Sequence, residues 1–272
     1  MFGVGVGVRV GGFTASGGVA PYVGLLDSYP GASAAYSLRL LKSDYTGNAI
    51  RVRRSSDNAE QNIGFDGSGN LDTTALTSFC GSGNGFVTTW YDQSGNSLDL
   101  TQSTAANQPQ IVSSGSVILQ NTKPAMQFFG NETVQNSFTP KLQPQSIFSV
   151  SRNTTASFGG TFGDNFQQAN RVGVGYYFIA SNFGNVAVDT ENSNNIITSF
   201  ILDGSNSKCK INNNTQLTGN AFTQTQSAIK LGAGNYFGAM TGFFQEYVQW
   251  PTNQNSNESQ IRTNQNTYYA IY

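Results

Sequence analysis

The stretch that most constrains the fold of this chain is 85–96, with the sequence GFVTTWYDQSGN. It begins with β-branched and aromatic residues, which favour a strand, and it ends in Asp, Ser, Gly and Asn, which favour a turn. Alternation divides the strand between two faces, with Phe86, Thr88 and Trp90 on one and Val87, Thr89 and Tyr91 on the other. Because both faces carry large apolar groups, we expect an interior strand with water excluded from both sides.

The turn after this strand contains Asp92 and Gln93, which could bind a ligand. Asp side chains at turns usually accept hydrogen bonds from the neighbouring backbone, however. We therefore interpret Asp92 as a structural residue and assign no chemistry to it.

The rest of the chain has the composition of many short strands joined by tight turns, because 31 of its 272 residues are glycine and Asn, Gln, Ser and Thr supply most of the polarity. Strands are expected at 49–54, 60–65, 116–120, 125–129, 146–151, 172–180, 186–189, 196–203, 208–212, 228–232 and 243–250. Short helices are expected at 34–41, at 72–80 with Asp72 as cap, and near the C-terminus after a capping box at 255–258. This spacing predicts an all-β jelly-roll sandwich.

Charge and composition exclude several functions. Only 11% of the residues are charged and the net charge is -1, so no basic surface for nucleic acid or an anionic membrane is expected. The chain contains no histidine, which removes Ser-His-Asp and Cys-His catalysis and the commonest zinc ligand. Cys80 and Cys209 either pair across the sandwich or remain buried thiols, and we favour thiols. No metal or cofactor is expected.

The N-terminal residues alternate glycine with valine and form neither a secretory signal nor a membrane span. They are either a disordered tail or an extended arm that docks on a neighbouring subunit. We therefore divide the chain into an arm, 1–20, and a single sandwich domain, 21–272.

Several motifs suggest a family. They are Arg54–Phe65 (RSSDNAEQNIGF), Ser78–Cys80, Trp90–Asn96, Leu100–Gln102, Gly242–Glu246 and Tyr268–Tyr272. This set resembles the catalytic domain of fungal α-L-arabinofuranosidase B, and it is also similar to domains of bacteriophage virion proteins. In both settings the resemblance implies a concanavalin-like sandwich. It covers roughly residues 35–105 and 228–272.

The resemblance also implies where catalytic residues should lie, and this chain departs from the pattern. The acid/base aspartate is expected in 231–241 (LGAGNYFGAMT), which has no carboxylate, and Asn235 or Tyr236 stands nearest. The nucleophile is expected in 158–171, which offers Gln167, Gln168 and, as a carboxylate, only Asp164. The family's disulfide partner for Cys80 would lie near Gly85, so that bond cannot form. Because asparagine cannot transfer a proton, we expect no glycosidase activity.

Two other carboxylate positions were considered. Alternation places Glu246 on one face with Phe244 and Val248, and we interpret it as a buried structural residue held by an arginine or a backbone donor. Asp189 and Glu191 lie in a polar turn and are interpreted as solvated.

The function expected from these observations is a non-enzymatic structural subunit of a bacteriophage particle, in the tail, a fibre or the head surface. The alternatives are a module that binds host-surface glycan and an active α-L-arabinofuranosidase. Candidate glycan-binding residues are Asp164, Asn165, Gln167, Asn235 and Tyr236. The expected partners are other virion proteins and copies of the same chain, since the resemblance implies that trimers are usual. The protein is expected on the virion, and neither nucleic acid nor a membrane is expected as a partner.

Overall fold

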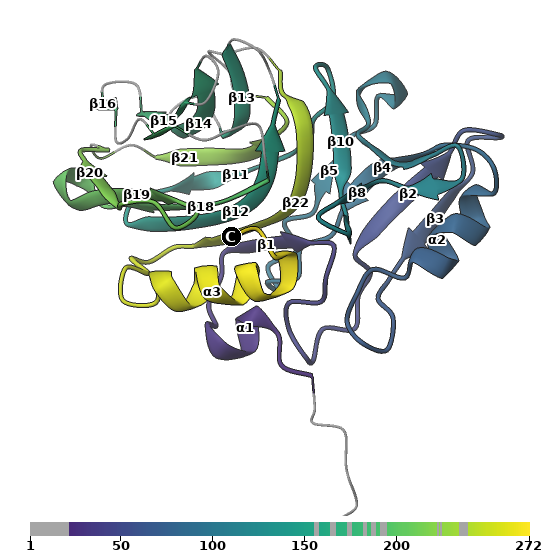
Figure 1. Ribbon diagram of the computed structural model, residues 1–272, viewed down its shortest axis with the longest axis horizontal. Coiled ribbons are helices and arrows are strands. Elements are labelled where there is room, and N and C mark those ends of the chain that lie inside the picture. Colours follow the sequence, from purple (N-terminus) through teal and green to yellow (C-terminus); the bar gives the residue numbers. More distant parts are fainter. Residues whose placement is uncertain are drawn as a thin grey trace, which may run out of the picture.

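The computed structural model describes residues 22–154, 158–163, 167–172, 176–181, 184–185, 189–190, 195–221, 223, 225–233 and 239–272. Its strands pair antiparallel and stack in two curved layers, with a third group of strands at one end (Figure 1). The predicted all-β sandwich with short helices is confirmed. Among the described residues, no helix is long and apolar enough to cross a membrane.

The first layer is built around β12 and β22, which pair along most of their length. Its strands are β1 (Ala34–Ser37), β10 (Met126–Phe129), β12 (Gln145–Asn153), β18 (Ile196–Leu202), β19 (Ser207–Ile211), β20 (Leu217–Gly219) and β22 (Thr241–Trp250). One face of this layer packs against the second layer. The other face is covered by α1 (Leu25–Ser28) and α3 (Glu258–Tyr269) (Figure 1).

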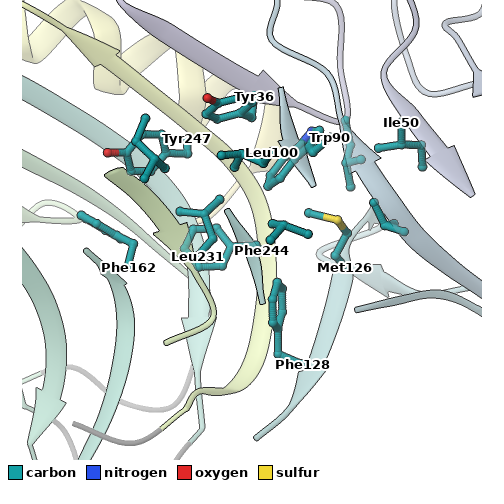
Figure 2. Packing of buried hydrophobic residues seen from close by; sticks show 14 of the residues in the cluster. Tyr36, Ile50, Trp90, Leu100, Met126, Phe128, Phe162, Leu231, Phe244 and Tyr247 are labelled. Atoms are coloured by element: carbon teal, nitrogen blue, oxygen red, sulfur yellow. The ribbon is translucent and has the colours of Figure 1, made fainter. Parts of the chain in front are cut away.

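The second layer follows the order β5–β11–β21–β13–β14–β15. The bounds are β5 (Leu100–Thr101), β11 (Val134–Lys141), β13 (Phe158–Gly163), β14 (Gln167–Val172), β15 (Tyr176–Ser181), β16 (Gly184–Asn185), β17 (Asp189–Thr190) and β21 (Gln226–Leu231). Leu231 and Phe162 of this layer meet Tyr247 and Phe244 of the first layer in one continuous core (Figure 2).

The third group contains the strand from which the sequence analysis started, β4 (Gly85–Trp90), between β2 on one side and β5 and β6 on the other. Its other members are β2 (Ile50–Arg54), β3 (Glu60–Ile63), β6 (Gln110–Ser113) and β7 (Ser116–Val117), and β8 (Leu119–Gln120) pairs with β9 (Lys123–Pro124). As predicted, β2 and β3 form a hairpin, and α2 (Thr73–Cys80) is capped by the Asp72 side chain, which accepts from Ala75 N at 2.8 Å.

The expectation that water is excluded from both faces of β4 is wrong, because a bulge breaks the alternation of its side chains between the two faces. The register with β2 passes from Arg51↔Thr89 to Val52↔Val87, so Thr88 is the extra residue. Val87 and Trp90 both reach the core in consequence, while Phe86 is half-buried on the outer face. The guanidinium of Arg53 covers the Phe86 ring at 4.9 Å from its centroid.

The turn after β4 is structural, as predicted. The Asp92 carboxylate is 5% exposed and accepts hydrogen bonds from the amides of Ala35 at 2.9 Å and Leu98 at 3.1 Å. Gln93 is also buried, and its side chain binds the backbone of Leu41 and Arg39. These hydrogen bonds hold the turn against the segment that contains β1.

That segment corrects a second prediction, since 34–41 does not form a helix. Ala34–Ser37 is strand β1, which pairs with β22 from Ala34↔Gln249 to Ser37↔Glu246. All four residues are buried, with Tyr36 facing the inter-layer core and Ala35 the helices. Pairing with β22 and burial of all four side chains outweigh the modest helix propensity of Ala and Leu.

The capping box predicted at 255–258 is also absent. Asn257 precedes α3 without a side-chain cap. The Glu258 carboxylate instead faces the sheet, where it accepts a hydrogen bond from Ser199 Oγ at 2.6 Å. It also forms an ion pair with Arg262 at 3.1 Å. The buried face of α3 consists of Glu258, Ile261, Arg262, Gln265 and Tyr269, so it joins the sheet partly through polar contacts.

Both cysteines are buried thiols that form no disulfide, as favoured from the sequence. The structure shows why Gly85 is small: a Cβ atom there would lie 2.7 Å from Cys80 Sγ and 3.1 Å from Val52. Position 85 is therefore adjacent to the Cys80 sulfur, but glycine supplies no second sulfur for a disulfide.

We predict that Gly85→Cys forms a disulfide with Cys80 under oxidising conditions. The closed loop is short, so the bond stabilises the fold by roughly 2 kcal/mol at most, before the cost of crowding Val52. Thiol titration of the oxidised, denatured variant should find one free thiol. Gly85→Ser, which adds the same Cβ without a sulfur, should keep two. Three titratable thiols in Gly85→Cys would contradict the predicted geometry.

Candidate functional site

The structure brings together the ends of the two segments in which the sequence analysis sought a site. The Gly232 amide donates to Thr161 O at 2.9 Å, next to the pair Phe162↔Leu231. The Met240 amide donates to Gly232 O at 2.7 Å, and a bridge joins Ala233 to Ala239. The described ends of 234–238 therefore lie beside β13, which leads directly into 164–166.

Gly232 allows this close approach. Its φ is +90°, which disfavours any residue with a side chain. A Cβ atom at Gly232 would lie 2.5 Å from Glu132 O and 2.5 Å from the Phe128 ring. The backbone at Gly232, just before 234–238, is thus packed tightly against β10 and against the residues that precede β11.

A layer of polar side chains lies between the sheets next to Gly232. On the inner face of β12, Ile147 belongs to the apolar core, but the next inward positions are Ser149, Ser151 and Asn153. Ser149 Oγ lies 2.7 Å from Oγ1 of Thr198, its partner on β18. Asn153 Nδ2 donates to Thr161 Oγ1 of β13 at 3.0 Å. We call Ser149, Ser151, Asn153, Thr161 and Thr198 the polar layer.

The polar layer is deeply buried, with each member at most 2% exposed. Ser151 Oγ has no hydrogen-bond partner among the residues that the structure describes. Buried hydroxyl groups without partners are rare because each costs about 1–3 kcal/mol. Through Thr161 the layer includes β13, the strand that leads into 164–166.

The predicted glycan-binding residues lie mostly outside the described residues. Asp164, Asn165, Asn235 and Tyr236 are not described. Gln167 begins β14, where its backbone pairs with Ser181, and its side chain is not described. The sequence analysis missed the polar layer, since isolated Ser, Thr and Asn residues within strands give no signal of a shared face.

Every carboxylate whose side chain the structure describes already has a hydrogen-bond or ion-pair partner. These are Asp27, Asp44, Asp57, Glu60, Asp66, Asp72, Asp92, Asp99, Glu132, Asp203, Glu246 and Glu258. The remaining carboxylates of the sequence are Asp164, Asp189 and Glu191. Asp189 lies in β17, opposite Tyr177 of β15.

Glu246 is the most deeply held of the described carboxylates, and its structural interpretation is confirmed. It is 0% exposed and forms an ion pair with Arg39, from Nε to Oε2 at 2.7 Å. Burial tends to raise the pKa of Glu246, but the charge and hydrogen bonds of Arg39, with bonds from Ser37 and Gln265, hold it below its ordinary value. The carboxylate is ionised and enclosed.

The face assigned to Glu246 needs one correction. Its register with β12 passes from Val150↔Glu246 to Ser151↔Phe244, so Gln245 forms a bulge. Phe244 therefore shares the inter-layer core with Tyr247, while Glu246 faces α3. Glu246 is directed away from the polar layer.

Within the described residues, no group of three or more Cys, Asp or Glu side chains is placed to hold a metal ion.

Part of the chain is similar to a known catalytic domain. Residues 27–140 match the family model of the catalytic domain of α-L-arabinofuranosidase B. No curated protein matches the chain.

Solved structures share the fold. A GH54 α-L-arabinofuranosidase mutant soaked with 4-nitrophenyl α-L-arabinofuranoside matches with a TM-score of 0.71 and 17% identity, over 89% of this chain and 63% of that one. An arabinofuranosidase in complex with arabinofuranosyl-α-1,2-xylobiose matches with a TM-score of 0.66 and 17% identity, over 86% and 62%. The chain thus spans less than two thirds of the proteins it matches, and at this identity the likeness shows the fold.

These matches correct the function expected from the sequence. The expectation of a non-enzymatic subunit of a bacteriophage tail, fibre or head is contradicted, because the matched family and structures are those of glycoside hydrolases. That expectation rested on the missing carboxylate in 231–241 and on the resemblance to virion domains. The oligomer, the docking arm, the glycan partner and the location on a particle were not tested and stay predictions.

Proposed function

We propose that this protein is a glycoside hydrolase that removes α-L-arabinofuranosyl groups from a glycan. The observation that carries the proposal is the match of residues 27–140 to the catalytic domain of α-L-arabinofuranosidase B. Two solved structures that share its fold are arabinofuranosidases, one soaked with 4-nitrophenyl α-L-arabinofuranoside and one in complex with arabinofuranosyl-α-1,2-xylobiose. Thr161 of the polar layer precedes Asp164 by three positions, so the layer borders a segment that would carry the site.

Glycoside hydrolysis of the usual kind requires two carboxyl groups. They lie about 5–5.5 Å apart in retaining enzymes and about 6.5–9.5 Å apart in inverting ones. The described carboxylates are occupied by structural contacts, so we assign the pair to the set Asp164, Asp189 and Glu191. One member acts on the anomeric carbon directly or through a water molecule, and the other protonates the leaving oxygen. Asp164 directly follows β13, the strand that contributes Thr161 to the polar layer.

A glycan-binding protein without hydrolysis is the second candidate. One observation favours it: the segment 231–241 contains no carboxylate, and Asn235 cannot act as a general acid.

The decisive experiment is incubation of the purified chain with 4-nitrophenyl α-L-arabinofuranoside. We expect nitrophenol release above that of heat-denatured protein, and little release from the matched arabinopyranoside, whose six-membered ring differs in shape. Saturable binding of arabinofuranosyl-α-1,2-xylobiose without release of arabinose would establish the binding protein instead. Neither binding nor release would overturn both candidates.

A further inference from the structure

An open cavity lies on the opposite side of the first layer from the polar layer. It has a volume of about 540 Å³ and is lined by α3, the end of α1 and the segments that contain Tyr22 and Ser68. Figure 1 shows both helices on the side of β1 away from β13 and β14. The volume is within the range of small-molecule sites, about 300–1,000 Å³.

The floor of this cavity contains the guanidinium of Arg39. Arg39 is only 5% exposed. Its Nε and Nη2 atoms bind Glu246, and Nη2 also donates to Asn264 Oδ1 at 2.9 Å. Nη1 has no acceptor among the described residues, although Arg39 lines the cavity. Two N–H donors of a nearly buried cation are therefore available to a ligand.

This guanidinium is held rigidly. Its carbon lies 4.9 Å from the ring centroid of Tyr268 and 5.5 Å from that of Tyr269. The ion pair with Glu246 fixes the opposite edge of the guanidinium. A ligand that accepts hydrogen bonds from Nη1 would not have to order a flexible side chain, which lowers the entropic cost of binding.

The charge of the cavity selects the class of ligand. The positive charge of Arg39 is balanced by the ionised Glu246 directly behind it, so an anionic ligand would gain little net attraction. The walls supply neutral groups instead: the hydroxyls of Ser28, Ser68, Thr263 and Thr267, the amide of Gln260, and the rings of Tyr22 and Tyr29. Hydroxyl and amide groups beside aromatic rings suit an uncharged, polyhydroxylated ligand.

We propose that the cavity between α1 and α3 is a second carbohydrate-binding site, which accepts a neutral sugar whose hydroxyl oxygens bind Nη1 of Arg39. The site would hold the glycan while the polar-layer side of the molecule acts on it. It does not depend on hydrolysis, because none of its residues belongs to the polar layer or to the assigned carboxylates.

Hydrogen exchange of the full chain tests the proposal, with xylobiose as the probe. Xylobiose has no arabinofuranosyl bond, so the result is independent of the hydrolase proposal. We expect the sugar to slow amide exchange in α3 and near Tyr22. Thr263→Trp, an exposed position on the cavity wall, should weaken this protection at least tenfold in sugar concentration. Ser259→Trp, exposed on the same helix but outside the cavity lining, should leave it unchanged.

Three outcomes would overturn the second site. They are the absence of xylobiose-dependent protection in α3, equal protection in the wild type and Thr263→Trp, and tighter binding of inorganic phosphate than of xylobiose at the same segments. Both tryptophan variants retain the buried face of α3, so a loss confined to Thr263→Trp cannot be ascribed to unfolding; matching far-ultraviolet circular dichroism spectra would verify this.

Discussion

Glu246→Gln is expected to lower the free energy of unfolding by about 3–5 kcal/mol, because removing one member of a buried ion pair leaves the other charge uncompensated. Arg39 is 5% exposed and would lose its ionic partner in a site where water cannot replace it. Urea unfolding at neutral pH measures the effect. The control is Glu60→Gln, whose partner Arg51 is 47% exposed; that loss should stay below about 1 kcal/mol.

The difference in stability between wild type and Glu246→Gln should also depend on pH. The folded-state pKa of Glu246 lies below its ordinary value of 4.5. Its stabilising contribution is therefore present above pH 4.5 and is lost as the pH falls through the folded-state pKa. The stability gap between wild type and Glu246→Gln should narrow over that acidic range. A variant as stable as wild type but inactive would contradict the structural role and mark Glu246 as catalytic.

The sequence predicted those features that depend on neighbours in the chain. The cap at Asp72, the β2–β3 hairpin and the structural turn at Asp92 all follow from residues a few positions apart. Such contacts are set by local backbone geometry, which side-chain type alone indicates.

Features that depend on distant partners were missed or misplaced. Whether Ala34–Ser37 forms a strand is decided by β22, more than 200 positions later. Bulges at Thr88 and Gln245 shift the face of each following side chain, and strict alternation cannot register an extra residue. The polar layer likewise exists only when β12, β13 and β18 are brought together.

The functional prediction failed for a related reason. The sequence analysis looked for carboxylates at the two places that the resemblance implies, and it found Asn235 nearest to one and Asp164 as the only carboxylate at the other. The structure shows instead which carboxylates are occupied: Asp92 by backbone amides and Glu246 by Arg39. Elimination of this kind requires the contacts of each carboxylate, which the sequence does not contain.

The central claim is that the chain hydrolyses arabinofuranosides with carboxylates from 164–191. Removing a general acid or base usually slows the chemical step by roughly 10²–10⁴-fold. We expect that loss in two of the variants Asp164→Asn, Asp189→Asn and Glu191→Gln. The third should retain activity close to wild type. Asp44→Asn, at a side chain that is 70% exposed and paired with Lys42, is the matched control and should retain full activity.

The most direct measurement is the initial rate of arabinose release from arabinofuranosyl-α-1,2-xylobiose by wild type, the three carboxylate variants and Asp44→Asn. All five proteins should first show the same unfolding midpoint in urea. The proposed account predicts release by wild type and Asp44→Asn, with a loss of at least a hundredfold in two of the three variants. No release by wild type, or undiminished release by all three variants, would contradict it.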